Sequence, residues 1–164
     1  MTYHVEGLTS DHDRTGFSCG VDALDRYLKT QAGQDARRDI ANCFVATELG
    51  VNIVAGFYTL AATSIALGEL PADQVRRLPK YPVLPGALIG RLAVDRRHAG
   101  RSLGGILLFD AVRRAASAAP AVFALVVDAK DENAGRFYRH FGFLPYATRP
   151  LSFFLPMATA RKLL

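Results

Sequence analysis

The sequence contains little of what secreted, membrane and metal-binding proteins need. Its 164 residues include no tryptophan and two cysteines, Cys19 and Cys43, which have neither CxxC spacing nor a histidine cluster. This argues against a disulfide framework or a zinc site and predicts two buried, reduced thiols. It also lacks the run of about 18 apolar residues that crosses a bilayer, and a secretion signal. We therefore expect a cytoplasmic protein with no membrane span and no metal.

What is present fits a folded protein with an acidic partner. Half of the residues (50%) are hydrophobic, and the chain length predicts a single domain over residues 1–164. The formal net charge is +5 and the pI is about 9.5. This balance favours a polyanion such as nucleic acid, or an acidic protein, although short basic clusters are equally typical of solvated faces.

Hydrophobic periodicity and breaker residues predict a mixed α/β fold. Helices are expected over residues 21–38, 71–78, 105–119 and 133–141, the last stopped by Gly142, and strands over residues 41–49, 53–65, 87–94, 121–128, 143–146 and 150–155. Residues 50–52 form a hairpin turn, and residues 66–86 form a surface excursion in which Pro79, Pro82 and Pro85 interrupt regular structure. On the helix over residues 105–119, an apolar stripe lies opposite Asp110, Arg113 and Arg114.

A glycine-rich loop connects a predicted buried strand to a predicted helix. Gly100, Gly104 and Gly105 surround Arg101, Ser102 and Leu103. Such a loop presents main-chain N–H groups and the positive end of a helix dipole, which suits a pyrophosphate. The triphosphate motif GxxxxGK[S/T] is absent, as is a GxGxxG after the first strand, so both nucleotide interpretations are excluded.

Two motifs resemble those of the GNAT superfamily of N-acetyltransferases. The first is the strand Leu92-Ala93-Val94-Asp95 followed by residues 99–104, similar to Q/R-x-x-G-x-G/A, with Ala99 and Ser102 as departures. The second is residues 133–143, similar to N-x-x-A-x-x-F-Y-x-x-x-G-F apart from the alanine position. The resemblance implies the GNAT fold, in which helices flank a central, mixed and mostly antiparallel twisted sheet.

The same resemblance implies acetyl-CoA as co-substrate and assigns the site. The cofactor-binding residues would be Leu92, Ala93, Val94, Ala99, Gly100, Arg101, Ser102, Leu103, Gly104, Gly105, Asn133 and Phe137. Tyr138 would be the general acid for the departing thiolate, because a phenol with a pKa of about 10 stays protonated at neutral pH. Asn133 is alternatively a helix N-cap. If the loop needs a positive φ at Ser102, serine costs roughly 1 to 2 kcal/mol relative to glycine.

Three further segments resemble the TacT and AtaT group of toxins from type II toxin-antitoxin systems. They are residues 17–29, 55–60 and 90–95. This resemblance implies acetylation of the α-amino group of aminoacyl-tRNA, a DNA-binding antitoxin of the ribbon-helix-helix type, and a homodimer. An α-amino group, with a pKa of roughly 7.7 to 8.0, is already partly neutral at pH 7 and needs no dedicated base.

The RNA contacts and two rival functions stay open at this point. We expect Arg76, Arg77 and Lys80 of the surface excursion to contact phosphates, and Arg91 to meet the tRNA acceptor end or to form an internal salt bridge. One rival is an acetyltransferase acting on a small amine or a protein N-terminus. The other is a non-catalytic GNAT-like module that binds RNA or protein.

Overall fold

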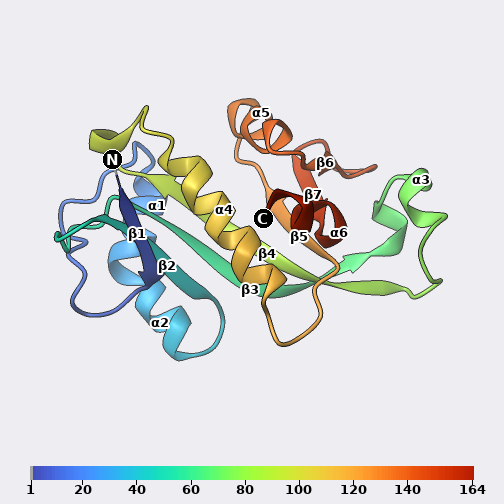
Figure 1. The fold of residues 1–164 in the computed structure, drawn as a ribbon, viewed down its shortest axis with the longest axis horizontal. Coiled ribbons are helices and arrows are strands. Elements are labelled where there is room, and N and C mark those ends of the chain that lie inside the picture. The colour runs from blue at the N-terminus through green and yellow to red at the C-terminus, as the bar shows by residue number, and fades with distance from the viewer. Residues whose placement is uncertain (1) are drawn as a thin grey trace. The chain divides into compact units, whose positions relative to one another are not determined.

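The computed structural model describes residues 2–164, which form two compact units (Figure 1). Unit 1 contains the residues up to Ala61 together with Gly90–Ala111, and unit 2 contains Ala62–Ile89 and Val112–Leu164. Two strands and one helix run from one unit into the other. Each unit is described by itself below.

The strands of unit 1 follow one another in the sheet in chain order. They are β1 (Tyr3–Gly7), β2 (Asn42–Glu48), the first half of β3 (Gly56–Ala66) and the end of β4 (Val83–Val94). β2 pairs antiparallel with both β1 and β3, so that Val5 lies opposite Ala46 and Val45 lies opposite Phe57. The β2–β3 hairpin was predicted, and its turn requires Gly50 at φ +77°. β1 was not predicted.

Two helices replace the single helix predicted over residues 21–38. They are α1 (Asp22–Thr30) and α2 (Ala32–Arg37), separated at Gln31. The Thr30 hydroxyl donates to the Arg26 carbonyl at 2.7 Å, a back-bond that bends helices. The hydrophobic pattern continues through the break, so the periodicity alone did not reveal it.

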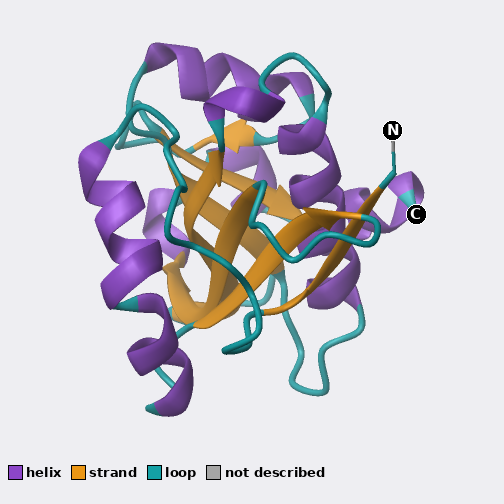
Figure 2. Cartoon of the chain, turned by 90° about the vertical axis from the view of Figure 1, so that its left-hand side faces the viewer, coloured by secondary structure: helices purple, strands orange, loops and turns teal. Residues whose placement is uncertain are grey.

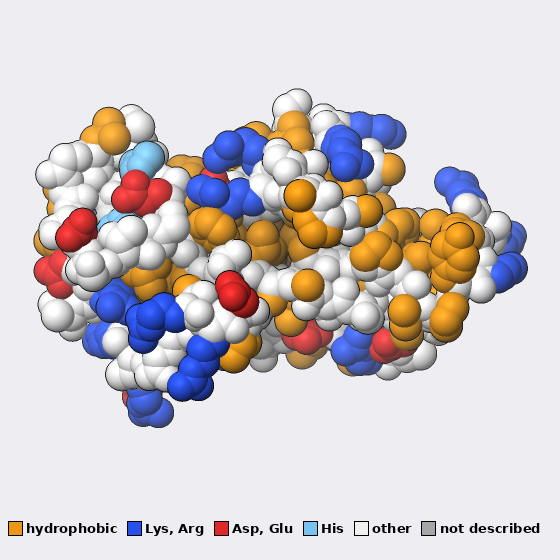
Figure 3. Space-filling model, turned by 90° about the horizontal axis from the view of Figure 1, so that it is seen from below, with side chains coloured by type: hydrophobic (Ala, Val, Ile, Leu, Met, Phe, Trp, Pro, Cys, Tyr) orange, Lys and Arg blue, Asp and Glu red, His pale blue; other side chains and the backbone are white. Residues whose placement is uncertain are grey.

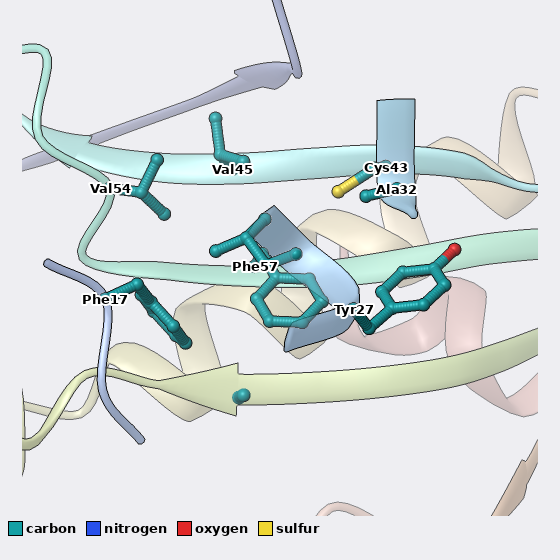
Figure 4. Close-up of a cluster of buried hydrophobic side chains, with 9 residues drawn as sticks. Phe17, Tyr27, Ala32, Cys43, Val45, Val54 and Phe57 are labelled. Carbon is teal, nitrogen blue, oxygen red and sulfur yellow. The ribbon is translucent and has the colours of Figure 1, made fainter. Parts of the chain in front are cut away.

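The core of unit 1 lies between α1, α2 and one face of its strands. Its members include Phe17, Tyr27, Val45 and Phe57, whose side chains converge in Figure 4. On the opposite face, a Cβ added to Gly56 would lie 3.0 Å from Leu107, so this glycine lets the helix after β4 pack closely. Figure 2 shows the strands with helices on both sides of them.

Around the glycine loop, the element boundaries differ from the prediction. β4 already begins at Val83 and includes Pro85, whose carbonyl accepts from the Phe123 N–H at 2.8 Å, so this proline does not break the strand. The helix α4 (Leu103–Ala116) starts two residues earlier than expected. Asp110 is 5% exposed rather than on the solvent face, because the Tyr58 hydroxyl donates to its carboxylate at 2.6 Å.

Unit 2 contains most of the remaining elements. They are the 3-10 turn η1 (Leu67–Glu69), α3 (Ala72–Val75), β5 (Ala124–Asp128), α5 (Glu132–His140), β6 (Leu144–Pro145), β7 (Ser152–Pro156), α6 (Met157–Ala160) and the 3-10 turn η3 (Arg161–Leu163). β5 is parallel to β4, whereas β7 pairs antiparallel with both β5 and β6. The architecture is mixed α/β with mostly antiparallel strands, as predicted.

Candidate active site

The glycine loop follows an aspartate that is buried at the end of β4. Asp95 is 1% exposed, and its carboxylate accepts from the Ser18 N–H at 3.0 Å, the Arg97 N–H at 2.9 Å and the Arg97 side chain. It thereby caps the 3-10 turn η2 (Arg96–His98). Burial raises the pKa of Asp95, but the hydrogen bonds from Arg97 and Ser18 outweigh it and lower the pKa to about 2. The segment before α1 is thus tied to the start of the glycine loop.

Between η2 and α4 the main chain twice adopts the left-handed conformation. Gly100 has φ +77° and Ser102 has φ +63°. Ser102 therefore adopts the positive φ that was considered for it, and the conformational cost of serine relative to glycine is expected at this position. A Cβ added at Gly100 would meet no atom within 4 Å, so this glycine is needed for its backbone angle and not for space.

The first turn of α4 offers N–H groups to an anion. The first hydrogen bond of the helix is donated by the Ile106 N–H to the Ser102 carbonyl at 3.2 Å. The N–H groups of Leu103, Gly104 and Gly105 come before it and have no acceptor within the helix. The dipole of this 14-residue helix places partial positive charge at the same end. These groups fit a pyrophosphate. The Ala99 N–H does not join them, because it donates to the Arg96 carbonyl at 3.2 Å.

The strand residues predicted to bind the acetyl end of the cofactor lie in unit 1 with the loop. The side chain of Ala93 belongs to the hydrophobic core, whereas Leu92 and Val94 are half-buried. Asp95 follows them directly, and its N–H donates to the Ala55 carbonyl at 2.8 Å. Residues 92–94 and 99–105 are thus brought together in this unit.

Tyr138 lies in unit 2 on α5, in an aromatic cluster. Its ring is 5.1 Å from that of Phe137 and 5.5 Å from that of Phe143, and the residue is 6% exposed. Burial raises the pKa of Tyr138 to about 12. The phenol therefore stays protonated throughout the neutral range.

The Tyr138 hydroxyl remains available for a further contact. Residues 2–164 provide it with no hydrogen-bond partner, yet no fully buried polar side-chain atom in this range lacks one. Its oxygen therefore keeps some access to solvent. A buried ring with an accessible, unpaired hydroxyl suits a donor to a bound substrate.

Asn133 is not the N-cap of α5. That position belongs to Asp131, whose carboxylate accepts from the Ala134 N–H at 2.9 Å. Asn133 lies inside the first turn, and its side-chain oxygen accepts from Arg136. Gly142 ends the helix at φ +94°, as predicted, and the Phe143 N–H donates to the Tyr138 carbonyl at 3.2 Å.

The histidines near the two motifs and the two cysteines differ in burial. His98 beside the loop is buried, with its Nδ1 2.8 Å from the Tyr3 hydroxyl. His140 is exposed on another face of α5 than Tyr138. Cys43 is buried and burial raises its pKa to about 12, whereas Cys19 is only partly buried, contrary to expectation.

Within the described chain, Arg91 stacks on an aromatic ring in place of the internal salt bridge weighed for it. Its guanidinium carbon lies 3.5 Å from the ring centroid of Tyr27, a cation–π contact, and residues 2–164 contain no ion pair of this arginine. The Tyr27 hydroxyl donates to Asp35 at 2.8 Å, which fixes the ring. Sequence reasoning missed Tyr27 because nothing local couples it to a strand residue so far along the chain.

Metal and membrane features are not found in the part of the chain that the structure describes. Residues 2–164 contain no group of three His, Cys, Asp or Glu side chains arranged to hold a metal ion. Among the same residues, every helix is too short or too polar to cross a bilayer.

Comparison with known proteins decides the family. The model of the acetyltransferase (GNAT) family matches residues 17–143. The chain belongs to this family. Its mixed α/β fold, with mostly antiparallel strands, is the GNAT fold.

Two relatives are similar to this GNAT chain over nearly its full length. A tRNA-acetylating toxin of Mycobacterium tuberculosis is 41% identical over 159 residues, covering 96% of this chain and 93% of that protein. A probable toxin TacT of Sinorhizobium fredii is 33% identical over 162 residues, covering 93% and 90%.

Solved toxin structures resemble it as well. A Tyr-to-Phe mutant of KacT has a TM-score of 0.93 at 27% identity and covers all (100%) of both chains. AtaT complexed with acetyl-methionyl-tRNAfMet has a TM-score of 0.91 at 29% identity, with 99% of each chain covered. A Tyr-to-Phe mutant of AtaT, bound to acetyl-CoA and to the C-terminus of the antitoxin AtaR, has a TM-score of 0.83 at 27% identity, covering 100% of this chain and 99% of that one.

Proposed function

We propose that this GNAT enzyme is the toxin of a toxin-antitoxin system and transfers an acetyl group from acetyl-CoA to the α-amino group of aminoacyl-tRNA, which blocks translation. The observation that carries the substrate is the 41% identity to a tRNA-acetylating toxin along almost the whole chain. Residues 1–164 would act as a single domain. Because charged tRNA is used in translation, the enzyme would work in the cytoplasm.

The glycine loop would hold the pyrophosphate of acetyl-CoA. The N–H groups of Leu103, Gly104 and Gly105 and the dipole of α4 supply the positive potential, with the exposed side chain of Arg101 beside them. Leu92, Ala93 and Val94 would line the acetyl end, and Asn133 and Phe137 would contact the cofactor from α5. Acetyl-CoA supplies an activated thioester. The support for this assignment is the geometry of the loop and an AtaT structure that contains acetyl-CoA.

Tyr138 would donate through its hydroxyl to the departing sulfur. With a pKa of about 12 it is a weaker acid than an ordinary tyrosine, so complete proton transfer to a thiolate with a conjugate-acid pKa of roughly 8.5 is uphill. Its role is therefore to donate a hydrogen bond as negative charge develops, while the amine loses a proton and the sulfur gains one. Tyr-to-Phe mutants among the similar toxin structures support the choice of a tyrosine.

The acceptor requires little help from a base. An α-amino group ionises at roughly pH 7.7 to 8.0, about two to three units below a lysine side chain. A chain without an assigned catalytic carboxylate is therefore better suited to aminoacyl esters than to lysine side chains.

The partners of this toxin would include an antitoxin and a second copy. The structures of AtaT bound to AtaR support an antitoxin that binds the acetyltransferase directly. A ribbon-helix-helix antitoxin and a homodimer extend that proposal. If a small gene lies immediately upstream, co-expression with it, followed by size-exclusion chromatography with light scattering, tests both the antitoxin complex and the homodimer.

Incubation with labelled acetyl-CoA and a panel of aminoacylated tRNAs tests the substrate. We expect label on one or a few aminoacyl-tRNAs and none on the same tRNAs after deacylation. Label only on small amines or on protein N-termini would replace this proposal by the rival acetyltransferase. Label on nothing, with RNA still bound, would leave the non-catalytic module.

A further inference from the structure

The excursion between β3 and β4 presents an aromatic ring beside three cations. Tyr81 is 61% exposed, and Arg76, Arg77 and Lys80 are exposed with it. In Figure 3, Lys and Arg side chains lie beside hydrophobic ones at the right of the view, in the part of the molecule where Figure 1 labels α3. Within residues 2–164, none of the three cations forms an ion pair. We call Arg76, Arg77, Lys80 and Tyr81 the excursion patch.

The excursion patch is built on ordered structure. Leu70 is buried, and Leu67, Val75 and Leu78 pack against the same hydrophobic cluster, which includes Phe154. The Leu67 N–H donates to the Pro82 carbonyl at 3.2 Å, which closes the excursion at its base. Prolines on both sides of Lys80 and Tyr81 restrict the main chain. The ring and the charges therefore need little ordering when a partner binds.

The chemistry of the excursion patch fits single-stranded nucleic acid. An exposed ring can stack on an unpaired base of any type, while adjacent cations neutralise the phosphates. A duplex would hide the faces of its bases. Of the nearby carboxylates, Glu69 is already paired with Arg149 at 2.9 Å, which leaves Asp73 as the local counter-charge.

We infer that Tyr81 stacks on a base in the single-stranded end of the RNA substrate, with Arg76, Arg77 and Lys80 on the flanking phosphates. The inference rests on the proposed function for the choice of RNA. It goes beyond the phosphate contacts expected from the sequence, because it adds a residue that recognises unpaired bases. Tyr81 is thus a binding residue and has no part in acetyl transfer.

The test measures binding without acetyl-CoA. The probe is a fluorescent single-stranded RNA of about 12 nucleotides ending in CCA, and the comparison is a blunt hairpin of the same length. We expect Tyr81→Ala to raise the Kd for the single strand about 10- to 100-fold. Tyr81→Phe keeps the ring and should stay within about twofold of wild type, and the hairpin should distinguish the variants little.

The salt dependence separates stacking from charge. Replacing Arg76 and Arg77 by glutamine should reduce the slope of log K against log salt by about 0.7 for each phosphate that the variant no longer neutralises. Tyr81→Ala should leave that slope unchanged. Replacement of the exposed Arg161 and Lys162 by glutamine is the charge-matched control, expected to alter neither slope nor base stacking.

Several results would overturn the inference. They are wild-type affinity in Tyr81→Ala, an equal loss of affinity in the control pair, or conversion of a dimer to a monomer by Tyr81→Ala in light scattering, which would make the patch an interface between copies. Acetylation of aminoacyl-tRNA is measured on the same preparations. Tyr81-dependent binding without any acetylation would reject the proposed function and keep the RNA surface.

Discussion

The glycine loop in unit 1 and the helix α5 in unit 2 carry two halves of the proposed chemistry in opposite ways. The loop would act through its main chain, with N–H groups at the start of α4 and two left-handed residues, Gly100 and Ser102. The helix would act through one side chain, Tyr138, whose ring is buried among Phe137 and Phe143.

This difference accounts for the two departures from the family motif that lie in the loop. A site made of N–H groups accepts other side chains as long as the backbone angles are reached, and the departures at Ala99 and Ser102 lie there. A site made of one hydroxyl accepts no such change. Four substitutions test the contrast.

The largest effect is expected for Tyr138→Phe. Loss of the donor should lower kcat about 100- to 10,000-fold while the KM for acetyl-CoA changes little. Steady-state acetylation of aminoacyl-tRNA measures this. Tyr146→Phe, which removes a hydroxyl from another buried tyrosine, is the matched control and should keep its activity. Full activity in Tyr138→Phe would remove the tyrosine from the mechanism.

Asp95→Asn should lower the free energy of unfolding by about 1 to 3 kcal/mol at pH 7, because it breaks a buried charged hydrogen-bond network. The folded pKa of about 2 lies below the ordinary 3.8, so the stabilisation is present above about pH 4 and is lost as the pH falls toward 2. Denaturant titrations of both proteins across this range should converge in acid. A constant difference at all pH values would contradict the assigned charge.

Gly100→Ala isolates the backbone contribution. With φ at +77° and open space around the new methyl group, the substitution costs roughly 1 to 2 kcal/mol in strain and nothing in sterics. We expect weaker acetyl-CoA binding by calorimetry, up to about tenfold, with kcat at saturation retained. Gly68→Ala, at an exposed glycine of η1 with open space and no positive φ, is the control. Unchanged affinity would show that cofactor binding does not depend on a glycine at position 100.

Ser102→Gly should give the smallest effect, and it should strengthen acetyl-CoA binding where Gly100→Ala weakens it. Glycine relieves the cost of φ +63°, so acetyl-CoA should bind at least as tightly as to the wild type. The same calorimetric titration measures it. A tenfold loss would mean that the serine hydroxyl, and not the main chain, contacts the cofactor.

The order of most elements, the loop and the helix that carries Tyr138 were predictable because each depends on local pattern. Strand, glycines and helix follow one another in the chain, and Gly142 marks the end of α5 through its own backbone angle. A positive φ at Ser102 was considered only as a condition on the local motif, and the structure has φ +63° there. These features use information contained within a few residues.

What the sequence did not reveal depends on distant partners. Asp110 has the pattern of a solvent-facing residue until Tyr58, 52 positions earlier, is seen to bind it. The cation–π contact of Arg91 with Tyr27 was not foreseen either, because Tyr27 is also distant in the sequence. β1 is short, and its pairing with β2 supplies what its own sequence does not specify.

Gly135 determines how closely α5 packs against β7. A methyl group at this position would lie 3.3 Å from the ring of Phe153, so the absent side chain sets how near the helix approaches β7. Alanine would raise helix propensity by about 1 kcal/mol and yet push the helix outward by tenths of an ångström. Because Tyr138 lies three residues further along α5, we expect a substitution at residue 135 to shift the position of Tyr138 while leaving the Tyr138 side chain itself unchanged.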